Sequence, residues 1–311
     1  MFDLWSFLHQ TAAASMAALF VLVLQHIFRD KLSPQWQYAV WMVVVLRLIL
    51  PVGWLGRSAI ADLTGLGEAS AWSSPWTPSL PLAGIPIPPA GGLPRSVTDW
   101  LFLLYLAGVL LSALWLAAGG LRLRRSLGEA VPVAGARLEA VAALAERFGL
   151  SMPRRVVESR AASTPFLVGV VRPVLVLPMG WAPDRKVILH ELIHLKQRDV
   201  AAGWVTALFR CVHWCNPFLW RIFDRIDNQR EQRCDQLVLE RLEGEDRRDY
   251  GRVLLSMADD GRRRFPGATT MANGGQNIKA RIQAITRFKA FPRGMGLVSV
   301  CMVVTLTLSL V

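Results

Sequence analysis

Charged side chains are scarce in this chain of 311 residues, since 19% of its residues are charged and 53% are hydrophobic. Four long stretches contain almost none, and the second of them is interrupted only by Arg47. An uninterrupted apolar run of about 20 residues can cross a bilayer as a helix. The composition therefore argues against an ordinary soluble protein and predicts four transmembrane helices, at about residues 4–28, 34–55, 100–121 and 294–311.

The N-terminus also lacks the basic leader of a cleavable signal peptide, and its apolar run is too long for one. Lys and Arg residues are enriched on the cytoplasmic side of membrane proteins. Arg29 and Lys31 lie between the first two spans, and "RLRRS" follows the third. This pattern predicts a multi-pass protein of a bacterial cytoplasmic membrane with both termini outside. Residues 1–121 form its membrane region, with a proline-rich extracytoplasmic loop at 56–98, and residues 122–293 form a cytoplasmic domain.

Acidic residues are too few to balance the basic ones. The segment between Leu121 and Arg293 carries the whole formal net charge of the chain, +12. We interpret this excess as positive-inside bias and contact with the anionic headgroups of membrane lipid. A nucleic-acid surface is the alternative, but the segment has neither stacking aromatics nor a known binding motif, so no direct nucleic-acid partner is expected.

Cysteine is rare as well, with four in the chain. Cys211 and Cys215 have helical spacing, but no second Cys or His pair completes a zinc knuckle. We expect them to be buried thiols of a cytoplasmic domain.

The segment 122–293 alternates between helix and strand patterns. Apolar residues at helical spacing occupy "ARLEAVAALAERFGL", and Val-rich stretches in "RRVVES" and "PFLVGVVRPVLVLP" predict two or three short strands. Helices are expected around His190 and at about residues 221–242. The order of helix, strands and helices predicts an α+β domain. The apolar run Val200–Trp220 is interpreted as one buried or membrane-grazing helix behind the His190 helix.

Two histidines four residues apart stand out in "VILHELIHLKQRD". In a helix His190 and His194 lie one turn apart on one face, where two imidazoles can hold a single Zn²⁺. Glu191 is rotated off that face and can act on water as a general base. This is the H-E-x-x-H pattern of zinc peptidases.

Catalytic zinc needs a third protein ligand, and "QREQRCDQLVL" offers carboxylates. Glu231 and Asp235 are four residues apart on one face of a predicted helix. We expect Glu231 to be the third ligand and Asp235 to accept the second N–H of a ligating histidine. The alternative is a solvated helical face with Arg–Glu pairs.

Several segments resemble the BlaR/MecR family of membrane-anchored gluzincin metallopeptidases. They are "HELIHLKQRD", "HWCNPFLW", "REQRCDQLVL", the strand segment "PFLVGVVRPVLVLP" and the second span "QYAVWMVVVLRLILPV". The resemblance implies four spans and a cytoplasmic gluzincin-type zinc protease domain. It also implies zinc on His190, His194 and Glu231, Glu191 as base, and Asp235 in support. Cys215 departs from the family pattern, which has Phe before Asn-Pro.

The family is linked to antibiotic resistance, and its best-known members transduce signals. The resemblance implies cleavage of a cytoplasmic protein such as a transcriptional repressor, and self-cleavage near the linker "GGQNIKARIQAITRFKAFPRG". The chain ends within the fourth predicted span, without the S-x-x-K pattern of the family's penicillin-binding sensor. The sequence leaves open whether the chain is a short member of the family or a fragment. It also leaves open whether the protein forms a homo-oligomer.

Two other functions compete with this one. Housekeeping membrane proteases of the HtpX or CAAX-processing type also use H-E-x-x-H and a later glutamate. The proline-rich loop and "HWCNPFLW" favour the signalling protease instead. A non-catalytic membrane scaffold would have no need for Glu191. Tyr250 and several arginines are candidate donors to a charged transition state, but ordinary helix packing is the preferred interpretation of Tyr250.

Overall fold

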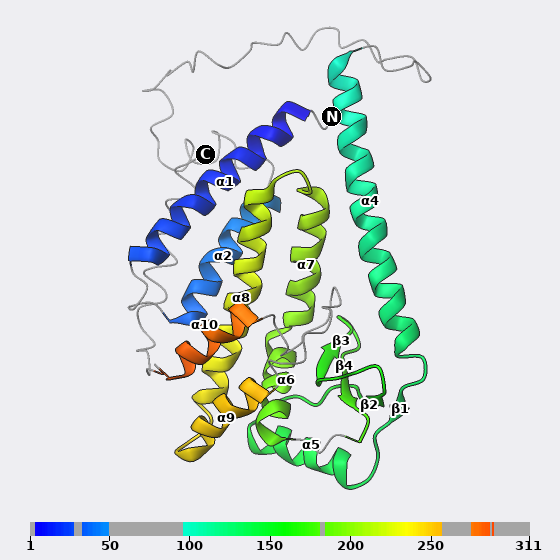
Figure 1. Ribbon diagram of the computed structural model, residues 1–311, viewed down its shortest axis with the longest axis vertical. Coiled ribbons are helices and arrows are strands. Elements are labelled where there is room, and N and C mark those ends of the chain that lie inside the picture. The colour runs from blue at the N-terminus through cyan, green and yellow to red at the C-terminus, as the bar shows by residue number, and fades with distance from the viewer. Residues whose placement is uncertain are drawn as a thin grey trace, which may run out of the picture.

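The computed structural model describes residues 4–27, 33–49, 96–180, 184–256, 275–286 and 288. Long helices stand side by side at one end, and a small sheet with shorter helices forms the other (Figure 1). The predicted helix-rich α+β class is confirmed. The fourth predicted span and residues 56–95 of the predicted loop lie outside the described residues, and the division into domains stays a prediction.

Three helices of the N-terminal region are described: α1 (Leu4–Ile27), α2 (Pro34–Ile49) and α4 (Val97–Ser126). Among the described residues, two helices are long and apolar enough to cross a membrane, through Gln10–Ile27 and Val97–Ser126. The third predicted span, 100–121, lies within α4, which is 30 residues long, and its bounds stay a prediction. The helix α2 covers the first part of span 34–55, and residues 50–55 are not described.

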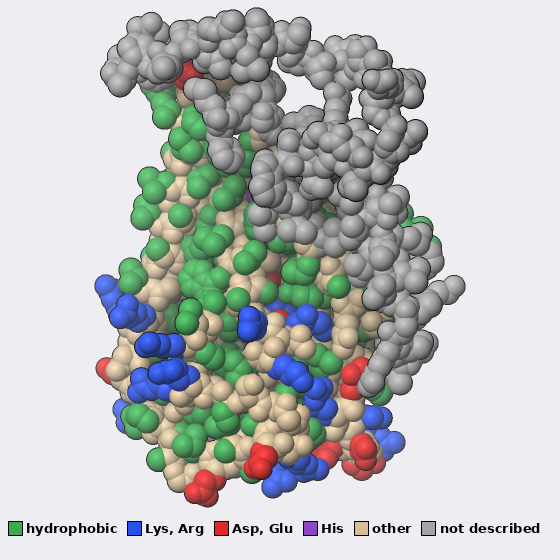
Figure 2. Space-filling model, turned by 180° about the vertical axis from the view of Figure 1, so that it is seen from behind, with side chains coloured by type: hydrophobic (Ala, Val, Ile, Leu, Met, Phe, Trp, Pro, Cys, Tyr) green, Lys and Arg blue, Asp and Glu red, His purple; other side chains and the backbone are tan. Residues whose placement is uncertain are grey.

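The helix α4 begins at a capping box. The Ser96 hydroxyl accepts a hydrogen bond from the Asp99 backbone N–H, and Asp99 Oδ2 accepts one from the Ser96 N–H, at 3.1 and 3.0 Å. These bonds satisfy N–H groups that a helix start leaves open. Beyond this cap most apolar side chains of α4 are exposed, Trp115 by 70%. Figure 2 shows hydrophobic side chains over the upper part of the described surface, with most charged side chains below them.

The sheet has four strands in the order β1-β2-β4-β3. They are β1 (Val131–Pro132), β2 (Arg155–Ser159), β3 (Phe166–Val168) and β4 (Val174–Pro178). The central strands β2 and β4 are parallel, and each outer strand is antiparallel to its neighbour. The two Val-rich stretches thus form three strands, as the sequence predicts, with β3 at an edge.

Five further helices surround the sheet and the site: α5 (Ala136–Arg147), α6 (Arg185–Gln197), α8 (Pro217–Leu239), α9 (Glu245–Ser256) and α10 (Gly275–Thr286). Apolar residues of α5, α6, α8, α9 and the strands form one buried core. A second core joins α1 and α2 to the first half of α8. The helix α8 therefore belongs to both the long-helix region and the core around the histidines.

The prediction of one helix over Val200–Trp220 is wrong. The chain forms α7 (Asp199–Val212), turns at residues 213–216 and returns as α8, so the two helices make an antiparallel hairpin (Figure 1). Asn216 caps α8 by accepting hydrogen bonds from the N–H groups of Phe218 and Leu219, and Pro217 occupies the first turn. A proline there starts a helix, because its missing N–H needs no partner.

The hairpin tip is bonded to both candidate membrane helices. Asn216 donates to Ser15 of α1 at 3.1 Å, and the His213 ring lies 3.3 Å from the Thr11 hydroxyl. On the other side, Tyr105 of α4 donates to the Val212 carbonyl at 2.9 Å. Buried polar groups are costly without such partners, so these bonds fix the tip between α1 and α4.

The cysteine prediction holds only in part. Cys211 is buried, but Cys215 is exposed because it lies in the turn of the hairpin. Cys234 is also buried, whereas Cys301 lies outside the described residues.

Candidate metal centre

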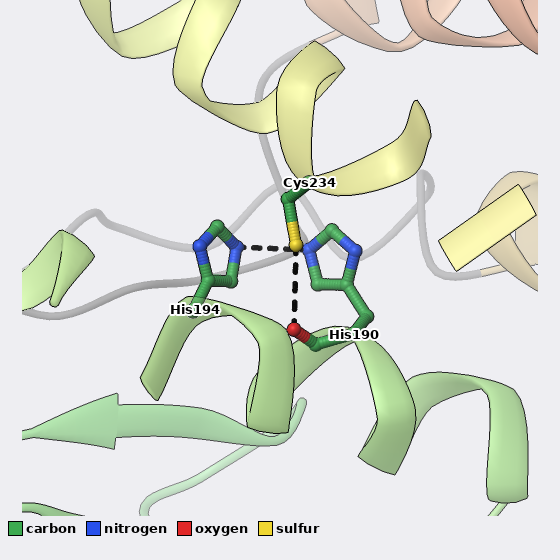
Figure 3. Close-up of side chains that lie close together, drawn as sticks. All are labelled: His190, His194 and Cys234. Atoms are coloured by element: carbon green, nitrogen blue, oxygen red, sulfur yellow. Dashed lines mark hydrogen bonds between the residues drawn. The ribbon is translucent and has the colours of Figure 1, made fainter. Parts of the chain in front are cut away.

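The helix α6 brings His190 and His194 together. Asp184 caps this helix by accepting a hydrogen bond from the Lys186 N–H at 2.8 Å. One turn separates the two histidines, and their Nε2 atoms lie 3.0 Å apart in a fully buried position. Figure 3 shows both imidazoles facing a common point. Glu191, between them in sequence, is also buried.

The helix α8 supplies the Glu231 carboxylate to the same point. Its Oε2 lies 3.5 Å from His190 Nε2 and 3.6 Å from His194 Nε2. Tetrahedral zinc with ligand bonds of 2.0–2.1 Å separates its donor atoms by about 3.3 Å. Glu231 is 2% exposed, and its Oε2 accepts no hydrogen bond from the part of the chain that the structure describes. A buried anionic oxygen at this spacing fits a bound cation.

Cys234 is a second candidate for a metal ligand. Its thiol and the two imidazoles offer donor atoms within 4.8 Å of one another (Figure 3). The thiol already has a partner, however, because it donates to the His190 carbonyl oxygen at 3.3 Å. We favour Glu231, whose facing oxygen has no such bond and lies at ligand spacing from both nitrogens.

Asp199 contacts the Nδ1 atom of His194, the ring nitrogen that does not face the candidate metal position. Arg198 adopts the left-handed conformation (φ 55°) that ends α6, and the resulting turn places Asp199 at the start of α7. The Asp199 Oδ2 lies 2.7 Å from His194 Nδ1. Its other oxygen accepts a hydrogen bond of 2.7 Å from Arg233. With Nδ1 donating, the Nε2 lone pair of His194 faces the candidate metal position.

Tyr250 of α9 holds His190. The Tyr250 hydroxyl donates to Asp235 Oδ1 at 2.6 Å, and its oxygen lies 2.8 Å from His190 Nδ1. Since the phenol has one proton and gives it to Asp235, His190 Nδ1 donates to the phenol oxygen. Asp235 is itself 3.4 Å from Nδ1. The structure thus places Asp235 behind His190, with Tyr250 between the two as an intermediary.

Arg281 of α10 completes this side of the site. Its guanidinium donates two hydrogen bonds of 2.7 Å to the two oxygens of Asp235. A further nitrogen lies 3.5 Å from Glu231 Oε2. Arg281 is 1% exposed, and its paired geometry with Asp235 is the strongest form of a charge-assisted contact.

The charges around the histidines favour a cation between them. Burial raises the pKa of Glu231, but the imidazoles and Arg281 outweigh burial and lower it well below its ordinary value. Burial lowers the pKa of His190, whereas Cys234 and Glu231 raise it, to about 9. Burial and Asp235 raise the pKa of Tyr250, so its hydroxyl stays a donor. The buried site therefore holds an ionised carboxylate and favours positive charge at the imidazole nitrogens.

Sequence reasoning missed Asp199, Arg281 and the bonded role of Tyr250. Asp199 closes the quoted zinc-helix segment, so its distance of five residues from His194 was a usable signal. Tyr250 and Arg281 are separated from their partners by 60 and 46 residues along the chain. No local sequence pattern predicts such contacts, because they depend on how α9 and α10 pack against α8.

Comparisons with known proteins cover the same region. The sequence model described as BlaR1 peptidase M56 matches residues 5–285. The regulatory protein BlaR1 of Bacillus licheniformis is 30% identical over 145 residues, which are 44% of this chain and 24% of that protein. The methicillin resistance mecR1 protein of Staphylococcus aureus is 28% identical over 137 residues, 42% of this chain and 23% of that protein. The matched part is about a quarter of each relative. The family match spans nearly the whole chain, which therefore belongs to the BlaR1 peptidase M56 family.

Proposed function

We propose that the chain is a membrane-bound zinc endopeptidase that transduces a signal by cleaving a cytoplasmic protein. The observation that carries this proposal is the convergence of two imidazole nitrogens and one carboxylate oxygen at 3.0–3.6 Å in a buried site. Glu191 lies beside the first of these ligands in the sequence. Three protein ligands leave a fourth position for substrate, as catalytic zinc requires.

The proposed roles follow from these positions. His190, His194 and Glu231 hold the ion, and Asp199 and Tyr250 fix the imidazole tautomers. Zinc supplies Lewis-acid chemistry, polarising a peptide carbonyl and making water more acidic. Glu191 takes a proton from the attacking water and passes it to the leaving amine.

The substrate is expected to bind in an extended conformation. The strand β3 is at the edge of the sheet and packs near α6, the helix that carries both histidines. An extended peptide can add to such an edge through main-chain hydrogen bonds. This would bring a peptide bond beside the metal without a sequence-specific pocket.

The membrane placement and the substrate class rest on different supports. The exposed apolar faces of α1 and α4 support insertion in a bilayer. One relative is named a regulatory protein and another a methicillin resistance protein, which supports a signalling role. A transcriptional repressor is the proposed substrate. Self-cleavage in the linker is proposed as well, because α10, in that linker, reaches the metal site through Arg281.

Glu191→Gln tests the proposal, because it removes the base and leaves the three proposed ligands in place. Purified full-length protein in detergent should contain about one zinc per chain in both wild type and variant. Wild type should cleave casein or a candidate repressor, and the variant should be slower by about 10²–10⁴-fold. Intact mass would detect self-cleavage in the wild type alone.

Arg248→Gln on the exposed face of α9 is the matched control and should behave as wild type. A zinc-loaded wild type as inert as Glu191→Gln towards every substrate would instead support a scaffold. Identical linker fragments from both proteins would exclude self-cleavage.

A further inference from the structure

Arg281 is unusual because it is a fully buried arginine that comes from outside the two helices bearing the proposed ligands. It lies on α10, which packs against α8 and α9 (Figure 1). Ile282 and Ile285 of the same helix pack on the core around the histidines. Burying a guanidinium is costly unless its N–H groups are paired, and the pairing is with Asp235.

A chain of hydrogen bonds leads from Arg281 to the proposed ligand His190. Arg281 donates to both oxygens of Asp235 at 2.7 Å. Tyr250 donates to Asp235 Oδ1 at 2.6 Å, and His190 Nδ1 is 2.8 Å from the phenol oxygen. We call these four side chains the His190 relay.

The direction of every bond in the His190 relay follows from Arg281. The guanidinium has donors and no acceptor. It therefore keeps both oxygens of Asp235 as acceptors, which obliges Tyr250 to donate its one proton to Asp235. The phenol oxygen is then free to accept from His190 Nδ1, and the Nε2 lone pair points at the ion.

We propose that Arg281 is a positioning residue for the metal ligand His190, so that the metal site is complete only when α10 is docked on α8 and α9. This inference rests on the proposed function, and it adds a condition that the two ligand helices alone do not contain. Neither the H-E-x-x-H pattern nor the α8 carboxylates require a contribution from α10.

Arg281→Met and Arg281→Lys test the inference through zinc affinity. Methionine keeps most of the length of the arginine side chain but has no hydrogen-bond donor. Lysine keeps the positive charge but lacks the two parallel donors that pair with both oxygens of a carboxylate. We expect Arg281→Met to weaken zinc binding about tenfold or more, the usual range for a group behind a ligand. Arg281→Lys should recover part of the loss. Competition with a chelating dye measures both, on the full chain in detergent.

A double-mutant cycle separates positioning from general support of the fold. In a Tyr250→Phe/Asp235→Asn background both routes from Asp235 to His190 are removed, so the cost of Arg281→Met should fall to about twofold or less. In an Asp199→Asn background, which affects the other histidine, that cost should persist in full. Arg252→Met on the exposed face of α9 is the control and should bind zinc as wild type does.

Three results would overturn the inference. One is a folded Arg281→Met protein with unchanged zinc affinity, and another is an undiminished effect in the Tyr250→Phe/Asp235→Asn background. If Arg281→Met does not fold, the same two comparisons apply to Arg281→Lys. A wild type that binds no zinc would refute the proposed function as well. Normal zinc binding and cleavage in Arg281→Met would refute the inference alone.

Discussion

The two histidines are held by different sets of side chains. His194 bonds directly to a carboxylate, Asp199, which is paired with Arg233. Arg233 in turn stacks over the Tyr38 ring of α2, 4.2 Å from its centroid. His190 reaches its carboxylate through the Tyr250 hydroxyl, and that carboxylate is paired with Arg281 of α10. One support thus ends on a long N-terminal helix and the other on the last described helix.

The two sets of contacts should therefore respond differently to substitution. We call the contacts of Asp199 with His194 and Arg233 the direct support. In it, one oxygen of Asp199 bonds to His194 and the other accepts from Arg233. The His190 relay has an extra member but also a reserve, because Asp235 Oδ1 already lies 3.4 Å from His190 Nδ1. We therefore expect damage to the direct support to cost more than damage to the relay.

Asp199→Asn should have the largest effect of the substitutions that follow. An amide offers one acceptor oxygen and a nitrogen donor, so either His194 or Arg233 must face an N–H group. We expect zinc affinity to fall about 100-fold, at the upper end for groups behind a ligand. Chelator competition measures the loss, and the Arg252→Met control should show none. If Asp199→Asn lowered zinc affinity less than Tyr250→Phe does, the His190 relay would matter more than the direct support.

Tyr250→Phe should have an intermediate effect. It removes the hydroxyl between His190 and Asp235, but a shift of under about 1 Å would let these two bond directly. Zinc affinity should fall about tenfold, in the lower range for such groups. Adding Asp235→Asn to Tyr250→Phe should cost more again, because it removes the reserve acceptor. If adding Asp235→Asn caused no further loss of zinc affinity, His190 and Asp235 would not bond directly in Tyr250→Phe.

Cys234→Ser should have the smallest effect, because the thiol donates to a backbone carbonyl and serine can do the same. Zinc affinity should change by less than about threefold. The wild type loaded with Co²⁺ should show no sulfur-to-metal charge-transfer band. A strong band that Cys234→Ser abolishes would make the thiol a ligand and would weaken the assignment of Glu231.

The sequence predicts the centre of the site better than its surroundings. His190 and His194 are one helical turn apart, and Glu231 lies on a helix whose residues 231 and 235 share a face, so local periodicity is enough to propose them. Their positions at ligand spacing in the structure agree with that proposal, although their roles as ligands stay predictions. The three Val-rich strands are likewise signalled by local composition.

The sequence does not predict the turn within the run Val200–Trp220 or the contacts between distant helices. The run Val200–Trp220 looks like one helix because its composition is uniformly apolar, yet Asn216 and Pro217 carry the start signal of a second helix. The bond between Tyr250 and His190 joins residues 60 positions apart, and the bond between Arg281 and Asp235 joins residues 46 positions apart. Helical periodicity says which face is apolar and does not say which distant helix will cover it.

The hairpin of α7 and α8 has a mechanical consequence. Its tip is bonded to Thr11, Ser15 and Tyr105, while its base carries Asp199 and Glu231. At about 1.5 Å per residue, Glu231 is about 20 Å from the tip. A tilt of about 3° in a rigid α8 would displace the carboxylate by about 1 Å, a misplacement that can slow an enzyme about 100-fold. Under the proposed function, small changes in the spacing of α1 and α4 would thus strongly change the rate of peptide cleavage.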